Sequence, residues 1–464
     1  RFVAALSDFA AGMIAQHGTW VAEGLEAGRF HQPPGRAEIE AGLAAELAGV
    51  EDMTGLQAAL RLVRNRFQLW IVWRHLTGRA PLEDTTGVLS DLADVLIDGA
   101  LDTLHGWLVE REGEPRDADG APQRMVVLGL GKLGARELNL SSDVDLIFAY
   151  PEPGATDRGR TCQQFFVRLG QQLIAALDTV TGDGFAFRVD MRLRPFGGSG
   201  PLAMHFAAME DYYVTHGRDW ERYAMIKARP CAGDLEAGAA LLAGLRPFVY
   251  RRYLDFGALD ALRDMKARLI AERHDPDDVK LGPGGIRDVE FTVQVQQLVW
   301  GGRQRALQDA RLLTVLPRLA EFGHLSADDV DALAAGYRFL RDAEHSLQAE
   351  SDQQTQSLPA QGLSRLRLAR SLGFSDYEAF EAVLDDHRGR VEAVFADLIG
   401  ETELPDSEGL QLWLHPDDRS RLAGFGFEDP EAAAGRLEML ITARDRSDVS
   451  GEARQRLDKL MPRL

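Results

Sequence analysis

The stretch from Met125 to Tyr150, MVVLGLGKLGARELNLSSDVDLIFAY, restricts the possible folds more than any other part of the chain. Its pattern predicts a buried strand, a glycine turn, a short helix and a second strand that carries Asp143 and Asp145. Side chains alternate faces along a strand, so both carboxylates are expected on one face, with Ile147. Paired carboxylates repel each other and lose solvation, and a divalent cation with oxygen ligands, Mg²⁺ or Mn²⁺, would stabilise them.

The same stretch contains a GxGxxG pattern, formed by Gly129, Gly131 and Gly134, which also occurs in dinucleotide-binding folds. Those folds need a full helix next and an acidic residue about 20 positions later. Here Asp143 and Asp145 follow much sooner, so we interpret the pattern differently. A glycine turn followed by Ser-Asp-x-Asp on a strand favours nucleotidyl transfer, in which turn amides hold phosphate oxygens and the aspartates hold metal ions.

Composition excludes several classes of protein. The net charge of the 464 residues is −20, with 72 acidic and 52 basic residues. Proteins that bind the nucleic acid backbone usually have a basic surface, so this composition argues against that class. The two cysteines, Cys162 and Cys231, form no CxxC pattern, which indicates a reducing compartment and hence the cytoplasm. No apolar run of about 18 residues predicts a membrane span. The sequence begins at Arg1 and stops at Leu464 within its hydrophobic pattern, so we expect a fragment of a longer protein.

Four regions follow from the hydrophobic periodicity. We predict a helical N-terminal region over residues 1–112, a mixed catalytic region over 124–232, and a helical bundle over 245–400. A short linker around Pro405 precedes residues 407–464, which are expected to form one or two further helices.

A second strand is predicted over Phe185–Leu193, where polar and apolar residues alternate. Its polar face carries Arg188, Asp190, Arg192 and Arg194. The simplest interpretation is a solvated edge strand. We favour a functional one, in which Asp190 joins Asp143 and Asp145 in a two-metal site and the arginines neutralise a phosphoryl group.

A further helix is predicted to start at Ile286, after the Lys280–Gly285 loop. Its polar stripe consists of Arg287, Glu290, Gln294 and Gln297. This stripe is either a solvated face or, for Arg287 and Glu290, the lining of the active cleft. We interpret His345, on a later helix, as a packing residue rather than a ligand.

Four blocks of sequence resemble glutamine synthetase adenylyltransferase, a bifunctional family with two nucleotidyltransferase domains. They are GLGKLGARELNLSSDVDLIF, RVDMRLRPFGGSGPL, DWERYAMIKAR and KLGPGGIRDVEFTVQ, and the resemblance runs from about Leu62 to Gly400. It implies an α+β, predominantly helical fold, with a polymerase-beta-like nucleotidyltransferase domain of mixed sheet flanked by helical domains. The adenylylating half of the family tends to read RLRPSG and WEHQALVRAR, which differ from this chain. The motifs of this chain, RLRPFG and WERYAMIKAR, are therefore similar to those of the N-terminal, adenylyl-removing half.

The resemblance also implies functional residues. Asp143, Asp145 and Asp190 match the metal-binding acids. The turn of Gly131, Lys132 and Gly134, with Ser142, matches the nucleotide-binding signature, although a lysine replaces its usual serine. Arg192, Arg194 and Lys227 would neutralise phosphate, while Lys227 could equally be a surface lysine.

The implied reaction is phosphorolysis of adenylyl-O-tyrosine on adenylylated glutamine synthetase, which uses inorganic phosphate and gives ADP and free tyrosine. Family membership further implies control by uridylylated PII protein. Two rival functions stay open: adenylylation of glutamine synthetase from ATP by the same fold, and a non-catalytic docking module. Neither nucleic acid nor a membrane is an expected partner.

Overall fold

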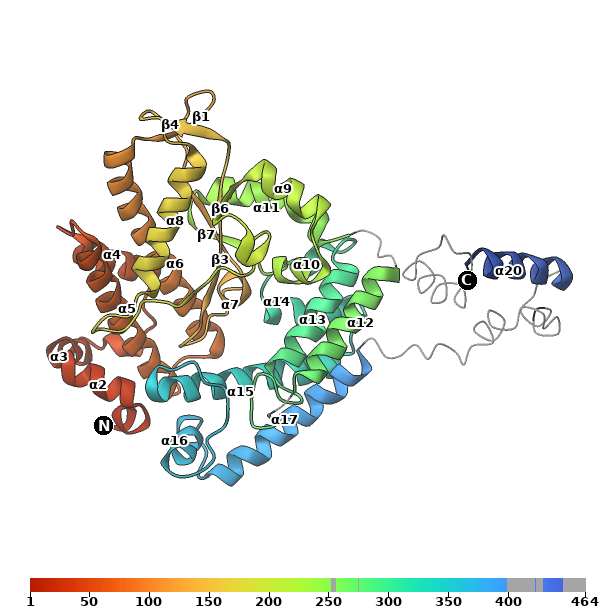
Figure 1. Cartoon of the computed structure of the whole chain (residues 1–464). Coiled ribbons are helices and arrows are strands. Elements are labelled where there is room, and N and C mark those ends of the chain that lie inside the picture. Colours follow the sequence, from red (N-terminus) through yellow and green to blue (C-terminus); the bar gives the residue numbers. More distant parts are fainter. Residues whose placement is uncertain (252–255, 274, 399–421, 423–428, 445–464) are drawn as a thin grey trace. The chain divides into compact units, whose positions relative to one another are not determined.

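The computed structural model describes residues 1–251, 256–273, 275–398, 422 and 429–444 (Figure 1). Residues 1–395 form one compact unit, and residues 396–464 form a second. The predicted N-terminal helices, mixed region and most of the helical bundle all belong to the first unit. The predicted linker around Pro405 and most of residues 407–464 lie outside the described residues.

The N-terminal region is helical, as its periodicity predicts. Asp52 caps α5 by accepting a hydrogen bond from the Gly55 amide at 2.8 Å, and α6 ends at Gly113, which has a positive φ of 85°. The helices of this region are α1 (Phe2–Leu6), α2 (Asp8–Gln16), α3 (Gly18–Glu26), α4 (Arg36–Leu47), α5 (Met53–Leu76) and α6 (Leu82–Glu112).

A small mixed sheet lies at the centre of the unit. Its strands run in the order β5-β3-β2-β7, and β6 also pairs with β3. The strands are β2 (Val126–Gly129), β3 (Val144–Tyr150), β5 (Val189–Asp190), β6 (Ala203–His205) and β7 (Arg229–Gly233), and a separate pair consists of β1 (Pro115–Asp117) and β4 (Gly154–Thr156). One face is covered by α6 and α8 (Cys162–Asp178), whose Phe165, Leu169 and Leu173 are fully buried.

The direction of the strands confirms that the glycine pattern is not a dinucleotide-binding fingerprint. β2 and β3 are antiparallel, with Gly129 opposite Leu146, and the helix between them, α7 (Gly131–Gly134), has a single turn. A dinucleotide-binding unit requires parallel strands joined by a full helix.

The predicted strand over Phe185–Leu193 is wrong in extent, because only Val189 and Asp190 pair as a strand. The amides of Ala186 and Phe187 donate to the carbonyl of Leu177, at the end of α8, instead of to a neighbouring strand. Beyond the strand, the Asp190 carboxylate accepts a hydrogen bond from the Arg192 amide at 2.8 Å and turns the chain.

Helices make up most of the rest of the unit. α13 starts at Ile286, as predicted, after Gly285. Buried residues of α13, α14, α15 and α17 form a second core beside that of the sheet. The helices are α9 (Phe206–Thr215), α10 (Asp219–Met225), α11 (Leu235–Val249), α12 (Phe256–Ala271), α13 (Ile286–Trp300), α14 (Leu312–Glu321), α15 (Ala327–Ser351), α16 (Leu363–Ser371) and α17 (Tyr377–Asp397).

The second unit contains α20 (Pro430–Arg444), and Ala434 of this helix forms a small buried cluster with Leu422. Across the described residues of both units, no helix combines the length and the apolar character needed to cross a membrane.

Candidate metal and nucleotide site

The sheet brings the three predicted acids to one end. Asp145 lies on β3 directly opposite Asp190 of β5, because these two strands are parallel with Val144 opposite Val189 and Asp145 opposite Asp190. Asp143 lies one residue before β3. The short parallel pairing therefore places side by side two carboxylates that are separated by 45 positions of sequence.

Electrostatics distinguish the three acids. Burial, together with the negative charges of Asp190 and Asp143, raises the pKa of Asp145 to about 6. Asp143 accepts a hydrogen bond from Arg188 at 2.6 Å. The Arg192 guanidinium binds both carboxylate oxygens of Asp190 and, although burial opposes it, holds the pKa of Asp190 below its usual value. The least compensated negative charge of the site thus belongs to Asp145.

The acids suit a hard cation in chemistry, since all three offer carboxylate oxygens. A cation beside Asp145 would also relieve the repulsion that raises its pKa. In the described part of the chain, however, the ligand atoms of the three acids do not all lie within 4.8 Å of one another. Two of the acids instead face their own arginines, Arg188 and Arg192.

The glycine turn packs directly against Asp145. Gly131 has a positive φ of 54°, and a Cβ added there would collide with the Asp145 carboxylate. A Cβ at Gly134 would collide with the carbonyl of Lys227, and the Gly134 amide already donates to Leu130. Gly131 therefore allows the turn to approach the acids, whereas Gly134 allows it to approach the segment that leads into β7.

Lys132 turns away from solvent. Its side chain is 10 % exposed, and its ammonium lies 3.6 Å from Glu344 of α15. Burial, together with the positive charge of Arg341, lowers the pKa of Lys132 to about 8. Whether this lysine also contacts phosphate stays a prediction.

Lys227 is buried, so the surface interpretation is wrong. Its ammonium donates to Glu290 of α13 at 2.7 Å and lies 3.8 Å from Glu137. Burial alone would raise the pKa of Glu290, but the positive charges of Lys227, Lys132 and Arg341 together outweigh it and hold this pKa below its usual value. The pair joins the segment before β7 to α13.

The predicted polar stripe of α13 divides in two. Glu290, Gln294 and Gln297 face the protein interior, and Gln294 donates to the carbonyl of Tyr223 at 3.3 Å. Arg287 instead forms a surface ion pair with Glu272 at 2.6 Å. The solvated-face interpretation therefore holds for Arg287 alone among these residues.

The remaining predicted residues lie around the acids. Arg194 donates to the carbonyls of Met191 and Gly198, at 2.8 and 3.2 Å, and so folds its own glycine-rich loop. Ser142 donates to the Asp143 carbonyl at 3.1 Å. Arg192 has a side chain that is 85 % exposed, so it can meet an incoming anion.

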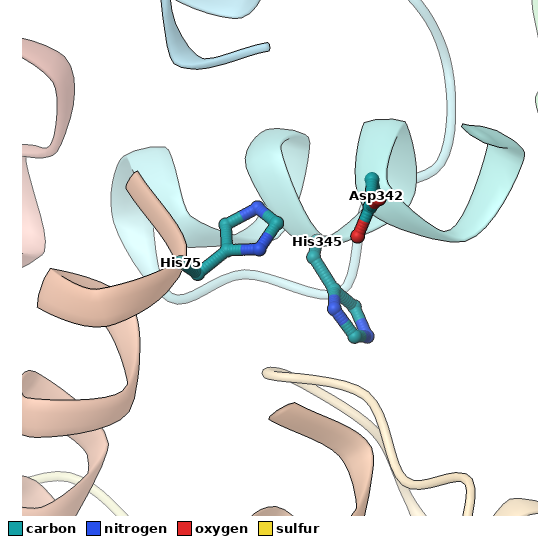
Figure 2. A group of neighbouring side chains, drawn as sticks. All are labelled: His75, Asp342 and His345. Atoms are coloured by element: carbon teal, nitrogen blue, oxygen red, sulfur yellow. The ribbon is translucent and has the colours of Figure 1, made fainter. Parts of the chain in front are cut away.

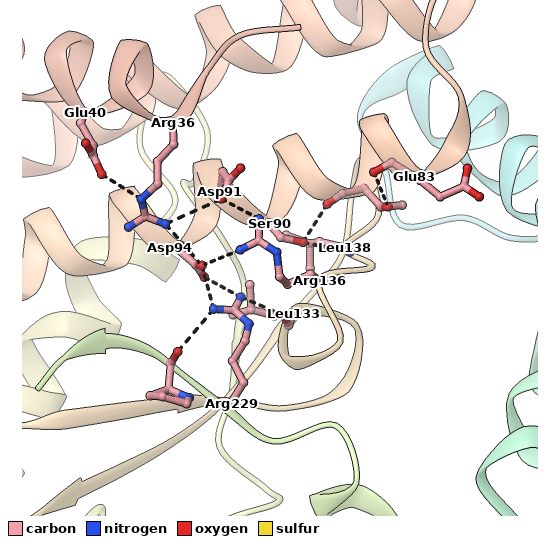
Figure 3. Close-up of polar contacts among 12 residues, drawn as sticks. Arg36, Glu40, Glu83, Ser90, Asp91, Asp94, Leu133, Arg136, Leu138 and Arg229 are labelled. Atoms are coloured by element: carbon pink, nitrogen blue, oxygen red, sulfur yellow. Dashed lines mark hydrogen bonds and ion pairs between the residues drawn. The ribbon is translucent and has the colours of Figure 1, made fainter. Parts of the chain in front are cut away.

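Helix α6 supports the glycine turn from one side (Figure 3). Arg229 binds both oxygens of Asp94 at 2.8 Å and also donates to the carbonyl of Leu133, within the turn. Arg136, which has a positive φ of 57°, donates to Asp91 at 2.7 Å. These contacts fix where the turn ends, and sequence reasoning missed Asp91 and Asp94 because they belong to a distant helix.

Helix α15 supports the segment between the turn and β3 from another side. Arg341 is fully buried and donates to the Glu137 carbonyl at 2.6 Å and to Asn139 at 2.7 Å. Gln348 accepts a hydrogen bond from the Ser141 amide at 2.8 Å. No local sequence pattern could predict these contacts, because about 200 positions separate the partners.

One more cation near the acids was missed. Lys280, in the loop before α13, lies close enough to oppose the rise in the pKa of Asp145 and to lower that of Lys132. The block KLGPGGIR contributed to the family resemblance, but its lysine was not assigned a role.

The fold and site together define a predominantly helical α+β protein with an acidic site at the end of a small mixed sheet. The family model described as glutamate-ammonia ligase adenylyltransferase matches residues 1–244, more than half of the chain, and a GlnD PII-uridylyltransferase model matches residues 261–399. The chain therefore belongs to the glutamate-ammonia ligase adenylyltransferase family, which confirms the resemblance.

Among the curated relatives are bifunctional glutamine synthetase adenylyltransferase/adenylyl-removing enzymes of two bacteria. The one from Thioalkalivibrio sulfidiphilus is 48 % identical over 99 % of this chain and 49 % of its own length. The one from Pseudomonas aeruginosa is 47 % identical over 100 % of this chain and 49 % of its own length. The chain thus spans about half the length of these relatives.

Proposed function

We propose that this chain removes the adenylyl group from glutamine synthetase by phosphorolysis. Inorganic phosphate would displace tyrosine from adenylyl-O-tyrosine and give ADP. The observation that carries the proposal is the pairing of Asp145 with Asp190 against the glycine turn at Gly131. Two sequence motifs support the adenylyl-removing direction: RLRPFG at Arg192–Gly197 and WERYAMIKAR at Trp220–Arg229.

The proposed reaction is an in-line displacement at the α-phosphorus. A phosphate oxygen forms the new P–O bond, the bond to the tyrosine oxygen breaks, and the phenolate takes a proton from water. Phosphate is already anionic and the leaving phenol has a pKa of about 10, so the site needs no strong general base. Asp143, Asp145 and Asp190 would hold Mg²⁺ or Mn²⁺, which would neutralise charge on the phosphoryl oxygens.

The basic residues have separate roles in this proposal. Arg192, the most exposed of them, would meet the incoming phosphate. Arg188 and Arg194 would hold the acids and the glycine-rich loop in place, through the bonds to Asp143 and to the loop carbonyls. Lys280 would add positive charge from the side of the helical region.

The proposed partners also rest on the family of the chain. Adenylylated glutamine synthetase is the proposed substrate. Uridylylated PII is the proposed regulator, supported by the match of residues 261–399 to a PII-uridylyltransferase model. A cytoplasmic location would suit both.

The direct test incubates the chain with fully adenylylated glutamine synthetase and Mg²⁺, with and without phosphate. Phosphate-dependent release of ADP is the expected result. Release of AMP without phosphate would make the chain a hydrolase. Incorporation of AMP from ATP into unmodified glutamine synthetase would favour the adenylylating direction, and binding without either reaction would favour a docking module.

The acid assignment has its own test. Asp145→Asn should abolish turnover and leave the fold intact, because it keeps the shape of the side chain and removes its charge. Asp119→Asn, at an exposed position in the turn after β1, is the matched control and should leave turnover unchanged. Normal activity of Asp145→Asn would refute the assignment.

A further inference from the structure

Two histidines and an aspartate that belong to none of the predicted sites lie close together (Figure 2). His75 lies at the end of α5, while Asp342 and His345 are three positions apart on α15. One ligand atom from each residue lies within 4.8 Å of the other two. Among the described residues, no other three histidines, cysteines or acids meet this condition.

His345 has no hydrogen-bond partner for either ring nitrogen, although it is completely buried. An imidazole always offers polar nitrogen atoms, and burying them without partners costs free energy. The ring of His75 lies 5.6 Å from that of His345, and its Nε2 is 3.0 Å from the hydroxyl of Ser346. Neither His75 nor the other described residues therefore supply a hydrogen-bond partner to the ring nitrogens of His345.

Asp342 completes the group from its partly exposed side. Within the described residues, its carboxylate has neither a hydrogen bond nor an ion pair, and Arg338, nearby on the same helix, is paired with Glu83 at 2.8 Å. Asp342 is partly exposed, whereas the rings of His75 and His345 are buried. Two imidazoles and one carboxylate form a ligand set typical of zinc, with a fourth position left for water.

The surrounding charges permit a dication. Arg341 and Lys132 lie close enough to act on His345, and both share the carboxylate of Glu344, at 3.4 and 3.6 Å, which offsets part of their positive charge. Zinc bonds to nitrogen and oxygen are about 2.0–2.1 Å long. A separation of up to 4.8 Å between ligand atoms is therefore wider than a bound ion requires, and modest side-chain rotations would close it.

We propose that His75, Asp342 and His345 bind one zinc ion that joins α5 to α15. This reverses the sequence-based interpretation of His345 as a packing residue. The site is independent of the proposed adenylyl-removing reaction. It would stabilise the contact between the N-terminal helices and the helix that supports the loop before β3.

The test uses the whole chain with Asp145→Asn as the parent, so that the acidic site binds metal weakly. Titration with Co²⁺ should give one equivalent of binding with the strong visible absorption of a tetrahedral, nitrogen-containing site, and Zn²⁺ should displace it. Zn²⁺ should also raise the melting temperature by mass action. His345→Gln and Asp342→Asn should each weaken Zn²⁺ binding by at least about tenfold.

His387→Gln is the matched control, because this histidine stacks on Phe339 and lies outside the group. It should leave Zn²⁺ affinity unchanged. Asp342→Asn alters a partly exposed side chain without hydrogen bonds, so it should fold even if His345→Gln does not. Absence of Co²⁺ absorption in the parent, or equal Zn²⁺ binding by folded Asp342→Asn and by His387→Gln, would overturn the proposal.

Discussion

Lys132 carries a positive charge into a region shielded from water. Its ammonium has no hydrogen bond, and Glu344, at 3.6 Å, is shared with Arg341. The folded-state pKa of Lys132 is about 8, against 10.5 for an ordinary lysine. The unfolded chain therefore binds more protons between these two values, and the charged lysine destabilises the native state below pH 8.

Lys132→Met should thus stabilise the protein at pH 7, by about 1–3 kcal/mol. The gain should shrink as the pH rises from 8 towards 10.5, where the native lysine is already neutral. Urea unfolding at pH 7 and pH 9.5, without metal, measures both values. If turnover falls in the same variant, the lysine is retained for function despite its cost; equal stability of both proteins at pH 7 would contradict the prediction.

The role of Gly131 in bringing the turn close to Asp145 can be tested by comparison with Gly120, another glycine of positive φ. Gly131→Ala adds backbone strain of about 1–2 kcal/mol and a Cβ that collides with Asp145. Gly120→Ala adds the strain alone, because nothing lies within 4 Å of its Cβ. Both should lower the melting temperature, but Gly131→Ala alone should reduce turnover, by about 10²-fold. Equal turnover in the two variants would show that the approach of the turn to Asp145 is not needed.

At the level of elements, α15 holds the segment that leads into β3. Arg341→Met removes the hydrogen bonds to Glu137 and Asn139 and should destabilise the protein by about 3–5 kcal/mol. Arg338→Met, on the same helix, breaks only a surface pair with Glu83 and should cost at most about 1 kcal/mol. Denaturant unfolding of the two variants tests this contrast, and similar losses would refute it.

The elements that the sequence predicted well are those with local signals. The strand, turn and strand around Gly131 follow from hydrophobic runs and glycines, and α13 begins where Gly285 ends its loop. The strand over Phe185–Leu193 was overestimated because the end of α8 satisfies its first amides. The roles of Asp94 and Arg341 could not be predicted, since their partners depend on how distant helices pack.

For the molecule as a whole, the N-terminal helices and the mixed sheet share one hydrophobic core. Leu96 and Leu104 of α6 belong to the same buried cluster as Val127 and Phe165, and Ala349 of α15 also belongs to it. The Gly233 amide, at the end of β7, donates to Asp98 of α6 at 2.8 Å. The regions that the sequence separates by composition are therefore joined by packing in the structure.

This shared core predicts how fragments of the chain behave. Residues 124–232 alone would expose the apolar face that α6 covers, at about 25 cal/mol per Å² of apolar surface, and should not unfold cooperatively. Residues 1–398 keep both this core and the second core of the helical region, and they should unfold with a melting temperature close to that of the full chain. Calorimetry of the two fragments and the full chain measures this. A cooperative transition for residues 124–232 would mean that the sheet is stable without its helices. The contacts of Asp94 and Arg341 would then adjust the geometry of the site but would not be needed for it to form.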